Sequence, residues 1–338
     1  MSAIVTFDNV SIVFGGKPEA ALPLMDEGLE RGEIQKRTGQ ILGVHDCSLT
    51  VEDGETLVLM GLSGSGKSTL LRAVNGLNPV CRGRVLVATE DGDVNVSTAD
   101  AKTLRHLRLT RIAMVFQQFG LLPWRTVREN VGLGLELGGL GRDARRGAVD
   151  KQLDLVGLGD WADRAVGELS GGMQQRVGLA RAFATEAPIL LMDEPFSALD
   201  PLIRTRLQDE LIDLKNRLGR TVIFVSHDLD EAFRLGDRIA IMEGGRIVQC
   251  GTPREIYSAP ANGYVADFVA NMNPLGVLCA EDLAEPLSAP RPAAEIPADT
   301  EISVVMERLA GDCDALAVRR DGQLVGQVTR RSVLRRLE

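Results

Sequence analysis

One stretch decides the fold of this 338-residue chain: Gly61-Leu62-Ser63-Gly64-Ser65-Gly66-Lys67-Ser68-Thr69. An apolar run, Thr56 to Met60, precedes it, and a helix-compatible run, Leu70 to Val74, follows it. Strand, glycine-rich loop and helix in that order are typical of a phosphate-binding loop, because glycines let backbone N–H groups turn onto an anion without Cβ clashes. Lys67 supplies a positive charge to the phosphates, and the Ser68 hydroxyl can ligate Mg²⁺. We therefore predict a nucleoside-triphosphate site, against the alternative of a glycine-rich turn with a solvated lysine, at Gly61, Ser63, Gly64, Gly66, Lys67, Ser68 and Thr69.

A second apolar run ends in two carboxylates. Ile189 to Met192 is typical of a buried strand, and Asp193 and Glu194 follow it directly. Ligands bind at the carboxyl ends of strands in parallel sheets, so both acids should lie near the phosphates. We predict that Asp193 holds Mg²⁺, directly or through water, and that Glu194 polarises the water that attacks the γ-phosphate. A solvated turn is the alternative, which the phosphate loop disfavours.

The third signal is the segment Leu169-Ser170-Gly171-Gly172-Met173-Gln174-Gln175-Arg176, followed by the helical run Val177 to Ala184. Ser170 is a good helix N-cap, and the glycines expose backbone N–H groups at a helix N-terminus, where anions bind. One active site does not need two such loops. In isolation, an N-capped helix without a ligand is the simpler interpretation.

Composition excludes several classes of protein. The formal charge is −9, from 47 acidic and 38 basic residues, so no broad basic face for nucleic acid is expected. The apolar runs are too short to cross a bilayer, and the N-terminus has no basic region or cleavage site typical of a signal peptide. If the protein acts at a membrane, another chain provides the membrane part. The five cysteines are scattered without a Cys-x-x-Cys pair, which favours reduced thiols over disulfides or zinc.

The chain divides into three parts by pattern. Residues 1–270 carry the motifs and include a segment at 15–40 that fits a short amphipathic helix between two strands. Residues 271–300 contain several prolines and are interpreted as a linker. Residues 301–338 predict a helix, a strand, an Asp321-Gly322 turn, a strand and a final helix.

Six ordered motifs together resemble the ATP-binding subunits of ABC transporters over residues 1–270. They are Gly61–Thr69, Gln117, Leu169–Arg176, Asp193-Glu194, Ser197-Ala198-Leu199-Asp200 and His227. The resemblance implies an α/β P-loop NTPase fold with a RecA-like core, an antiparallel β subdomain and an α-helical subdomain. It also implies ATP and Mg²⁺ as cofactors, ATP hydrolysis, and a head-to-tail homodimer. In that dimer, Ser170, Gly171 and Gly172 of one chain close on the γ-phosphate held by Lys67 of the other.

The same resemblance implies roles for further residues. Gln117 would contact Mg²⁺ and sense the attacking water, and His227 would contact the γ-phosphate. Asp200 would link the two sites across the dimer, Phe14 would stack on adenine, and Gln174 belongs to the segment that meets the nucleotide. Two positions depart from the family pattern, since Met173 stands where Gln is common and Phe14 replaces the frequent Tyr. Neither departure removes a charge or a phosphate donor.

Within the family, the insertion at residues 15–40 resembles that of ATPases of glycine betaine/proline/choline importers. The amino-acid sequence of the segment from Gly120 to Val127 favours the choline-type branch. The resemblance implies integral membrane permease subunits and a periplasmic or extracellular solute-binding protein as partners. It places the chain at the cytoplasmic face of the inner membrane, peripheral through the permease.

Other functions remain as alternatives. They are an ATPase for a different small-solute importer, a soluble ABC protein of DNA repair or translation, and a nucleotide-binding regulator without turnover. Repair types need a long coiled-coil insertion and translation types two ATPase units per chain, and neither is found here. A regulator would lack Glu194 or His227.

Two further segments carry hypotheses. Residues 301–338 resemble a single CBS-type module, where the betaine ATPases usually have a pair, so the tails of two chains pair or the unit is vestigial. The loop from Gln118 to Arg125 places Trp124 beside Gln117. It either packs locally or docks a helix from a membrane subunit.

Overall fold

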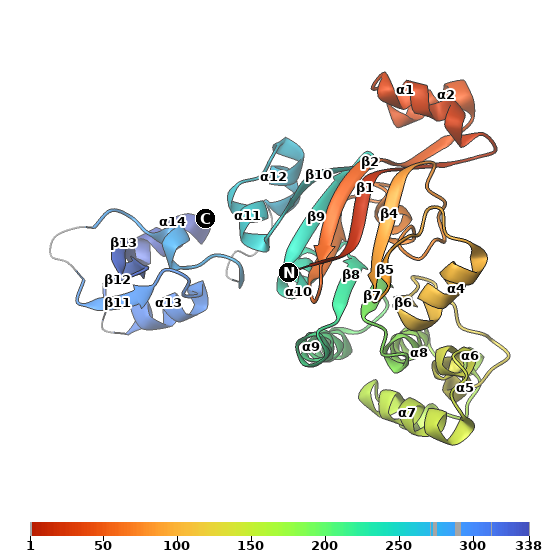
Figure 1. Ribbon diagram of the computed structural model, residues 1–338. Coiled ribbons are helices and arrows are strands. Elements are labelled where there is room, and N and C mark those ends of the chain that lie inside the picture. The colour runs from red at the N-terminus through yellow and green to blue at the C-terminus, as the bar shows by residue number, and fades with distance from the viewer. Residues whose placement is uncertain (1, 271, 273–275, 288–291, 312, 338) are drawn as a thin grey trace. The chain divides into compact units, whose positions relative to one another are not determined.

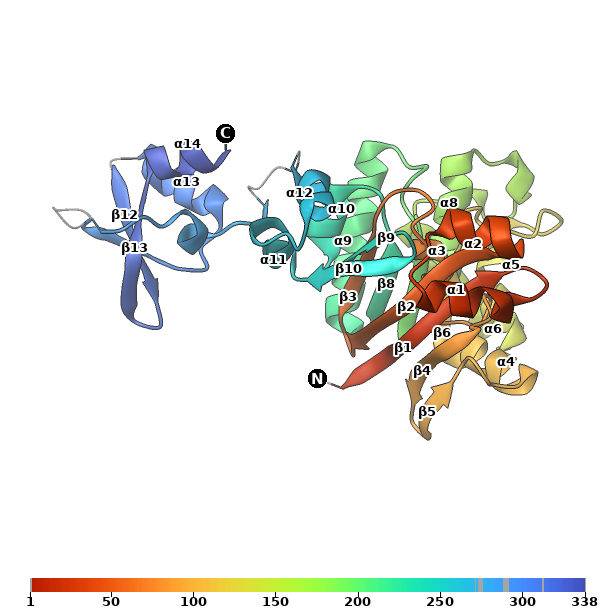
Figure 2. The same ribbon diagram turned by 90° about the horizontal axis from the view of Figure 1, so that it is seen from above.

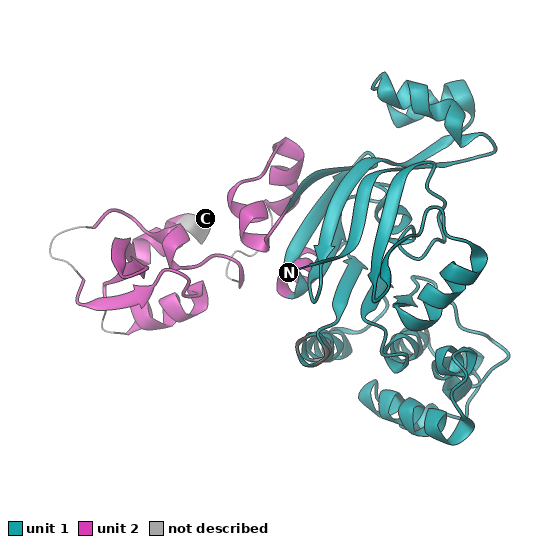
Figure 3. Cartoon of the chain, viewed as in Figure 1, with its two compact units in different colours: residues 1–227, 235–250 teal, residues 228–234, 251–338 magenta. Residues whose placement is uncertain are grey.

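The computed structural model describes residues 2–270, 272, 276–287, 292–311 and 313–337. The chain separates into two compact units, residues 1–227 with 235–250 and residues 228–234 with 251–338 (Figure 3). Within the described ranges, no helix is long and apolar enough to cross a membrane.

A six-stranded sheet forms the base of the first unit. Its order is β10-β9-β3-β8-β7-β6, and the five strands from β9 to β6 run parallel. β3, β7 and β8 are buried along their whole length, as expected of parallel strands covered on both faces. The bounds are β3 (Thr56–Met60), β6 (Ile112–Val115), β7 (Ile189–Asp193), β8 (Thr221–Val225), β9 (Arg238–Glu243) and β10 (Arg246–Gly251).

A four-stranded antiparallel sheet lies beside it (Figure 1). Its strands, in spatial order, are β2 (Ile41–Glu52), β1 (Ala3–Phe14), β4 (Arg82–Thr89) and β5 (Gly92–Asn95). One hydrophobic core joins the two sheets, with Val5 and Val51 from the antiparallel sheet and Leu57 and Leu191 from the parallel one. The short helix α3 (Lys67–Leu71) contributes Leu71 to the same core.

Helices between β6 and β7 form a separate group (Figures 1 and 2). α5, α6 and α7 all contact helix α8. Residues 132–141 are rich in glycine, yet Leu133–Leu137 forms the short helix α6. Gly134 of this helix packs closely on Thr185, since a Cβ at Gly134 would lie 2.5 Å from Thr185 Cγ2. The helices of the first unit beyond α3 are α4 (Ala101–Thr110), α5 (Val127–Val131), α6 (Leu133–Leu137), α7 (Arg142–Leu155), α8 (Gly171–Ala184) and α9 (Pro201–Leu218).

The insertion at residues 15–40 differs from the single helix that we expected. It contains a 3₁₀ turn, η1 (Pro18–Ala21), and two helices, α1 (Leu22–Asp26) and α2 (Arg31–Thr38). Gly28, with φ of +79°, lies between the helices and ends the regular path of the chain. A small apolar core holds the insertion to the ends of β1 and β2, formed by Val13, Ala21, Met25, Ile34 and Leu42.

The second unit contains a three-stranded sheet, β11-β12-β13, with β11 parallel and β13 antiparallel to β12. The predicted order of helix, strand, turn, strand and helix is confirmed by α13, β12, β13 and α14, with Asp321 and Gly322 at positive φ in the turn. Its elements are α10 (Leu229–Leu235), α11 (Pro253–Ser258), α12 (Gly263–Val269), β11 (Ala294–Pro297), α13 (Ile302–Ala310), β12 (Ala315–Arg320), β13 (Gln323–Thr329) and α14 (Arg330–Leu337).

The interpretation of residues 271–300 as a linker needs correction for the part that the structure describes. This segment supplies strand β11 and the turn η5 (Ala280–Leu283), and its side chains Leu278, Leu283 and Ile296 are buried in the core of the second unit. Prolines are compatible with a short edge strand, because an edge strand need not donate on its outer side. Residues 271, 273–275 and 288–291 of the predicted linker lie outside the described residues.

Candidate functional site

The phosphate loop, residues 61–69, connects β3 to α3 and is tightly enclosed. A Cβ on Gly61, where φ is +139°, would lie 2.1 Å from the carbonyl oxygen of Met242. A Cβ on Gly66, where φ is +101°, would lie 2.6 Å from the carbonyl oxygen of Gly43. Both the backbone conformation and the close neighbours therefore require glycine at these two positions.

Lys67 is buried at the start of α3. Its Nζ donates to the carbonyl oxygens of Gly61 at 2.8 Å and Leu62 at 3.0 Å, so the ammonium curls back over the loop. Burial lowers the pKa of Lys67, and the nearby carboxylates of Glu194 and Asp193 oppose that shift.

The structure brings together Ser68 and Asp193, two of the three predicted Mg²⁺ ligands. Ser68 Oγ donates to Asp193 Oδ1 at 2.7 Å, and the Asp193 side chain is fully buried. Arg72 donates to Asp193 Oδ2 from Nε at 3.1 Å and from Nη2 at 2.7 Å, which compensates the buried charge. The sequence analysis missed Arg72, although its place one turn after Ser68 on the same helical run is a usable signal.

The donor set fits Mg²⁺. A hydroxyl and a carboxylate oxygen are ligands that Mg²⁺ prefers, and protein sites usually add substrate phosphates and water. The described residues contain no cluster of three His, Cys, Asp or Glu side chains that could hold a metal by themselves. The arrangement therefore suits an ion that arrives with a nucleotide.

Glu194 is the meeting point of the predicted catalytic residues. Gln117 Nε2 donates to Glu194 Oε2 at 3.1 Å, and His227 Nδ1 lies 3.7 Å from the same oxygen. The three residues follow the carboxyl ends of β6, β7 and β8, which are adjacent in the sheet. Glu194 has φ of +49°, a conformation that a non-glycine residue adopts only where its surroundings hold it.

Gln175 is one of the surroundings that hold Glu194, and the sequence analysis did not assign it a role. Its side chain is buried in α8, donates to the carbonyl oxygen of Glu194 at 3.1 Å and accepts from the Ala198 N–H at 3.0 Å. The Ser197 hydroxyl also donates to the Glu194 carbonyl at 3.1 Å. The start of α8 is thereby joined to the segment that carries the catalytic candidate.

The second predicted anion site lies at the N-terminus of α8. Ser170 caps the helix by accepting from the Met173 N–H at 3.4 Å. The Gln174 amide donates back to the carbonyl oxygens of Val166 and Leu169, at 3.2 and 3.0 Å, so this side chain does not extend beyond the helix N-terminus. The hydrogen-bond partners of Lys67, Ser68 and Asp193 among the described residues do not include Ser170, Gly171 or Gly172 of the same chain.

Asp200 and Phe14 occupy the flanks of the site. Asp200 caps α9 by accepting from the Ile203 N–H at 3.1 Å. Phe14 is 38% exposed. Its ring packs against the backbone of β2 at Gly43, where an added Cβ would lie 2.8 Å from Phe14 Cε2 and 3.0 Å from Thr69 Cγ2. The aromatic ring therefore lies next to the end of the phosphate loop, as an adenine platform requires.

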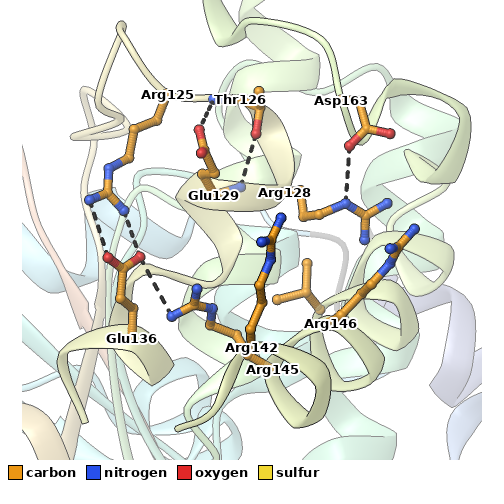
Figure 4. Close-up of a pocket in the computed structure, with 10 residues that line it drawn as sticks. Arg125, Thr126, Arg128, Glu129, Glu136, Arg142, Arg145, Arg146 and Asp163 are labelled. Carbon is orange, nitrogen blue, oxygen red and sulfur yellow. Dashed lines mark hydrogen bonds and ion pairs between the residues drawn. The ribbon is translucent and has the colours of Figure 1, made fainter. Parts of the chain in front are cut away.

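A pocket of about 560 Å³ lies among α5, α6 and α7 (Figure 4). Ion pairs join Arg125 to Glu136 at 2.8 Å and Arg128 to Asp163 at 3.2 Å, whereas Arg142 extends into the pocket. Trp124, which is 77% exposed, directly precedes Arg125, one of the residues that line this pocket. Local packing therefore does not account for Trp124.

Comparisons with known proteins show what this chain resembles. The family model described as ABC transporter matches residues 44–197. The chain is 49% identical over 284 residues to the glycine betaine/proline betaine transport system ATP-binding protein ProV of Escherichia coli, covering 84% of this chain and 70% of ProV. It is 42% identical over 334 residues to the trimethylamine N-oxide transport system ATP-binding protein TmoW of Ruegeria pomeroyi, covering 98% of this chain and 96% of TmoW.

A solved structure is similar in fold to most of this chain. It is the dimeric post-hydrolysis state of the ATP-binding cassette MJ0796 with ADP and Pi, at a TM-score of 0.63 and 30% identity. The match covers 74% of this chain and 99% of that structure.

Proposed function

This chain belongs to the family of ABC transporter ATP-binding subunits, and on that premise we propose that it powers the import of quaternary ammonium compounds. It is an ATPase of the ABC type. The observation that carries the import function is the 42% identity to TmoW over almost the whole of both chains, together with the likeness to ProV. ATPases for other small-solute importers are the second candidate.

The catalytic group is Glu194 with Gln117 and His227. Glu194 accepts a proton from the attacking water, and the Gln117 amide fixes the carboxylate oxygen that does so. His227, which is exposed and lies 3.7 Å from the same carboxylate oxygen, contacts the γ-phosphate. Mg²⁺, when bound, neutralises charge on the phosphates, and Ser68, Asp193 and Gln117 are the residues that would hold it.

Two chains form the working unit. Lys67 of one chain holds the phosphates, and Ser170, Gly171 and Gly172 of the partner complete the site from the opposite side. Asp200 lies at the start of α9, close in sequence to Glu194, and links the two sites across the dimer. The dimeric state of the MJ0796 cassette supports this arrangement.

The solute belongs to the class that the relatives' names describe: glycine betaine, proline betaine or trimethylamine N-oxide. These compounds share a methylated cationic or dipolar nitrogen. The choline-type branch, which the segment from Gly120 to Val127 favours, adds choline to the candidates. The binding protein and the permease, rather than this chain, select among them.

The remaining partners follow from the same family. Integral membrane permease subunits dock near Trp124, a solute-binding protein delivers the solute outside, and the chain works at the cytoplasmic face of the membrane. Residues 301–338 act as a CBS-like unit that pairs across the dimer, or are vestigial.

Reconstitution tests the proposal. The protein is placed in liposomes with its permease, and ATP hydrolysis is measured with the binding protein loaded with choline, glycine betaine, proline betaine or trimethylamine N-oxide. Stimulation by one of these solutes is the expected result and names the substrate. Basal ATPase activity without stimulation by any of them would contradict quaternary ammonium import and leave the ATPase assignment intact.

A further inference from the structure

Arg31 connects the inserted helices to the phosphate loop. It is the first residue of α2 and is half-buried. Its Nη1 donates to the carbonyl oxygen of Gly64 at 2.5 Å, and its Nε donates to that of Leu42 at 2.8 Å. Its Nη2 donates to Leu42 as well and to the carbonyl oxygen of Gly43 at 3.3 Å. One guanidinium thus holds two separate segments of backbone.

The two segments are the two halves of the nucleotide site. Leu42 and Gly43 belong to β2, which pairs with β1 at Phe14 and lies directly under the Phe14 ring. Gly64 belongs to the phosphate loop. The position of Arg31 is itself secured, because Ile34 of α2 is buried in the small core with Leu42.

We propose that Arg31 is a positioning residue that fixes the spacing between the adenine platform and the phosphate loop, so that the insertion sets the affinity for adenine nucleotides. The inference rests on the proposed role of Phe14. A guanidinium suits this task, because its planar fork of donors can reach several carbonyl oxygens at fixed angles. A lysine ammonium keeps the charge but not the fork.

The proposal distinguishes ligands by their length. ATP spans both halves of the site, so its binding depends on their spacing. Inorganic tripolyphosphate reaches only the phosphate loop, so its binding does not. A charge effect of Arg31 would act on both ligands, because both carry the phosphates.

Binding measurements on the full chain test this difference. Dissociation constants for Mg²⁺ complexes of ATP and of tripolyphosphate are compared in Arg31→Ala, Arg31→Lys and a matched control, Arg37→Ala. Arg37 lies on the same helix, is exposed and pairs with Glu33, one turn away, at 2.9 Å. We expect Arg31→Ala to weaken ATP binding about tenfold and tripolyphosphate binding less than about twofold, with Arg31→Lys in the same direction and Arg37→Ala unchanged.

Two results would overturn the proposal: unchanged ATP affinity in Arg31→Ala, or equal losses for both ligands. If thermal unfolding shows that Arg31→Ala does not fold, the same comparison in Arg31→Lys decides. Phe14→Ala, measured in parallel, separates the two levels. Unchanged ATP affinity in Phe14→Ala would remove the adenine platform and the Arg31 proposal with it, whereas a loss there without a loss in Arg31→Ala would remove the Arg31 proposal alone.

Discussion

The side-chain amide of Gln175 bridges the carbonyl oxygen of Glu194 and the N–H of Ala198, at 3.1 and 3.0 Å. The helix whose N-terminus we propose to meet the partner's nucleotide is therefore bonded to the segment that carries Glu194, the proposed catalytic carboxylate. A displacement of the N-terminus of α8 can therefore shift Glu194 through the buried side-chain amide of Gln175.

We expect Gln175→Ala to lower kcat about tenfold while KM for ATP changes little. The substitution removes the acceptor of the Ala198 N–H and one of the restraints on Glu194. A tenfold fall in kcat corresponds to an increase of about 1.4 kcal/mol in the activation free energy. Steady-state ATPase kinetics measure the split between kcat and KM. Gln175→Glu keeps the acceptor and loses the donor, so it should fall as well. An increase in KM without a change in kcat would contradict a positioning role.

Glu194→Gln should stop turnover and retain a closed, ATP-loaded dimer. The amide cannot accept the proton of the attacking water, and loss of a general base typically costs 10² to 10⁴ in rate. Size-exclusion chromatography with radiolabelled ATP would detect a dimer with unhydrolysed nucleotide. Rapid hydrolysis by this variant would remove Glu194 from the catalytic role.

Arg72→Ala should destabilise the fold, because it removes the guanidinium that donates two hydrogen bonds to the fully buried carboxylate of Asp193. Removing one partner of such a pair costs about 3 kcal/mol in the free energy of unfolding. Denaturant unfolding measures the loss, and a double-mutant cycle with Asp193→Asn provides the control. The Asp193→Asn change should recover most of the stability in the Arg72→Ala background. If the two losses simply add, the pair is not coupled.

ATP binding should take up protons at alkaline pH. Burial holds the pKa of Lys67 below its ordinary value, so the free enzyme loses this proton at a lower pH than an ordinary lysine does, whereas bound phosphates favour the charged form. Titration calorimetry at about pH 9, in two buffers of different ionisation enthalpy, measures the uptake. Lys67→Arg remains charged and should show none. The same uptake in that variant would assign the proton to another group.

Trp124→Ala should leave the ATPase activity of the isolated chain within about twofold of the native value. The stimulation of that activity by the permease and the solute-loaded binding protein should fall about tenfold. An exposed tryptophan of this kind is a typical anchor of a protein interface. Trp161→Ala, which changes the other tryptophan, 39% exposed, is the control. Equal stimulation in Trp124→Ala and the native chain would end the docking hypothesis.

The sequence predicts local elements well and distant partners poorly. The phosphate loop and the strand before Asp193 are readable because strand, turn and helix signals are contiguous there. Arg72 and Asp193 are 121 positions apart, so the only local signal for their contact is the helical spacing between Arg72 and Ser68. The prediction of one helix at residues 15–40 is wrong, because Gly28 adopts a positive φ between two helices. The spacing of apolar residues along the sequence does not reveal this conformation.

The linker prediction failed for a different reason. Composition identified prolines between residues 286 and 297, but burial of Ile296 against the second unit depends on neighbours that lie elsewhere in the chain.

The enclosure of Gly61 and Gly66 has a thermodynamic consequence. Carbonyl groups of Met242 and Gly43 fill the space that side chains would need, so the phosphate loop has little freedom to sample other conformations. A flexible loop would lose about 1–2 kcal/mol per residue on being ordered by its ligand. A loop that is already held in its binding shape avoids most of that loss, so more of the contact energy with the phosphates is available for the proposed closure of two chains around ATP.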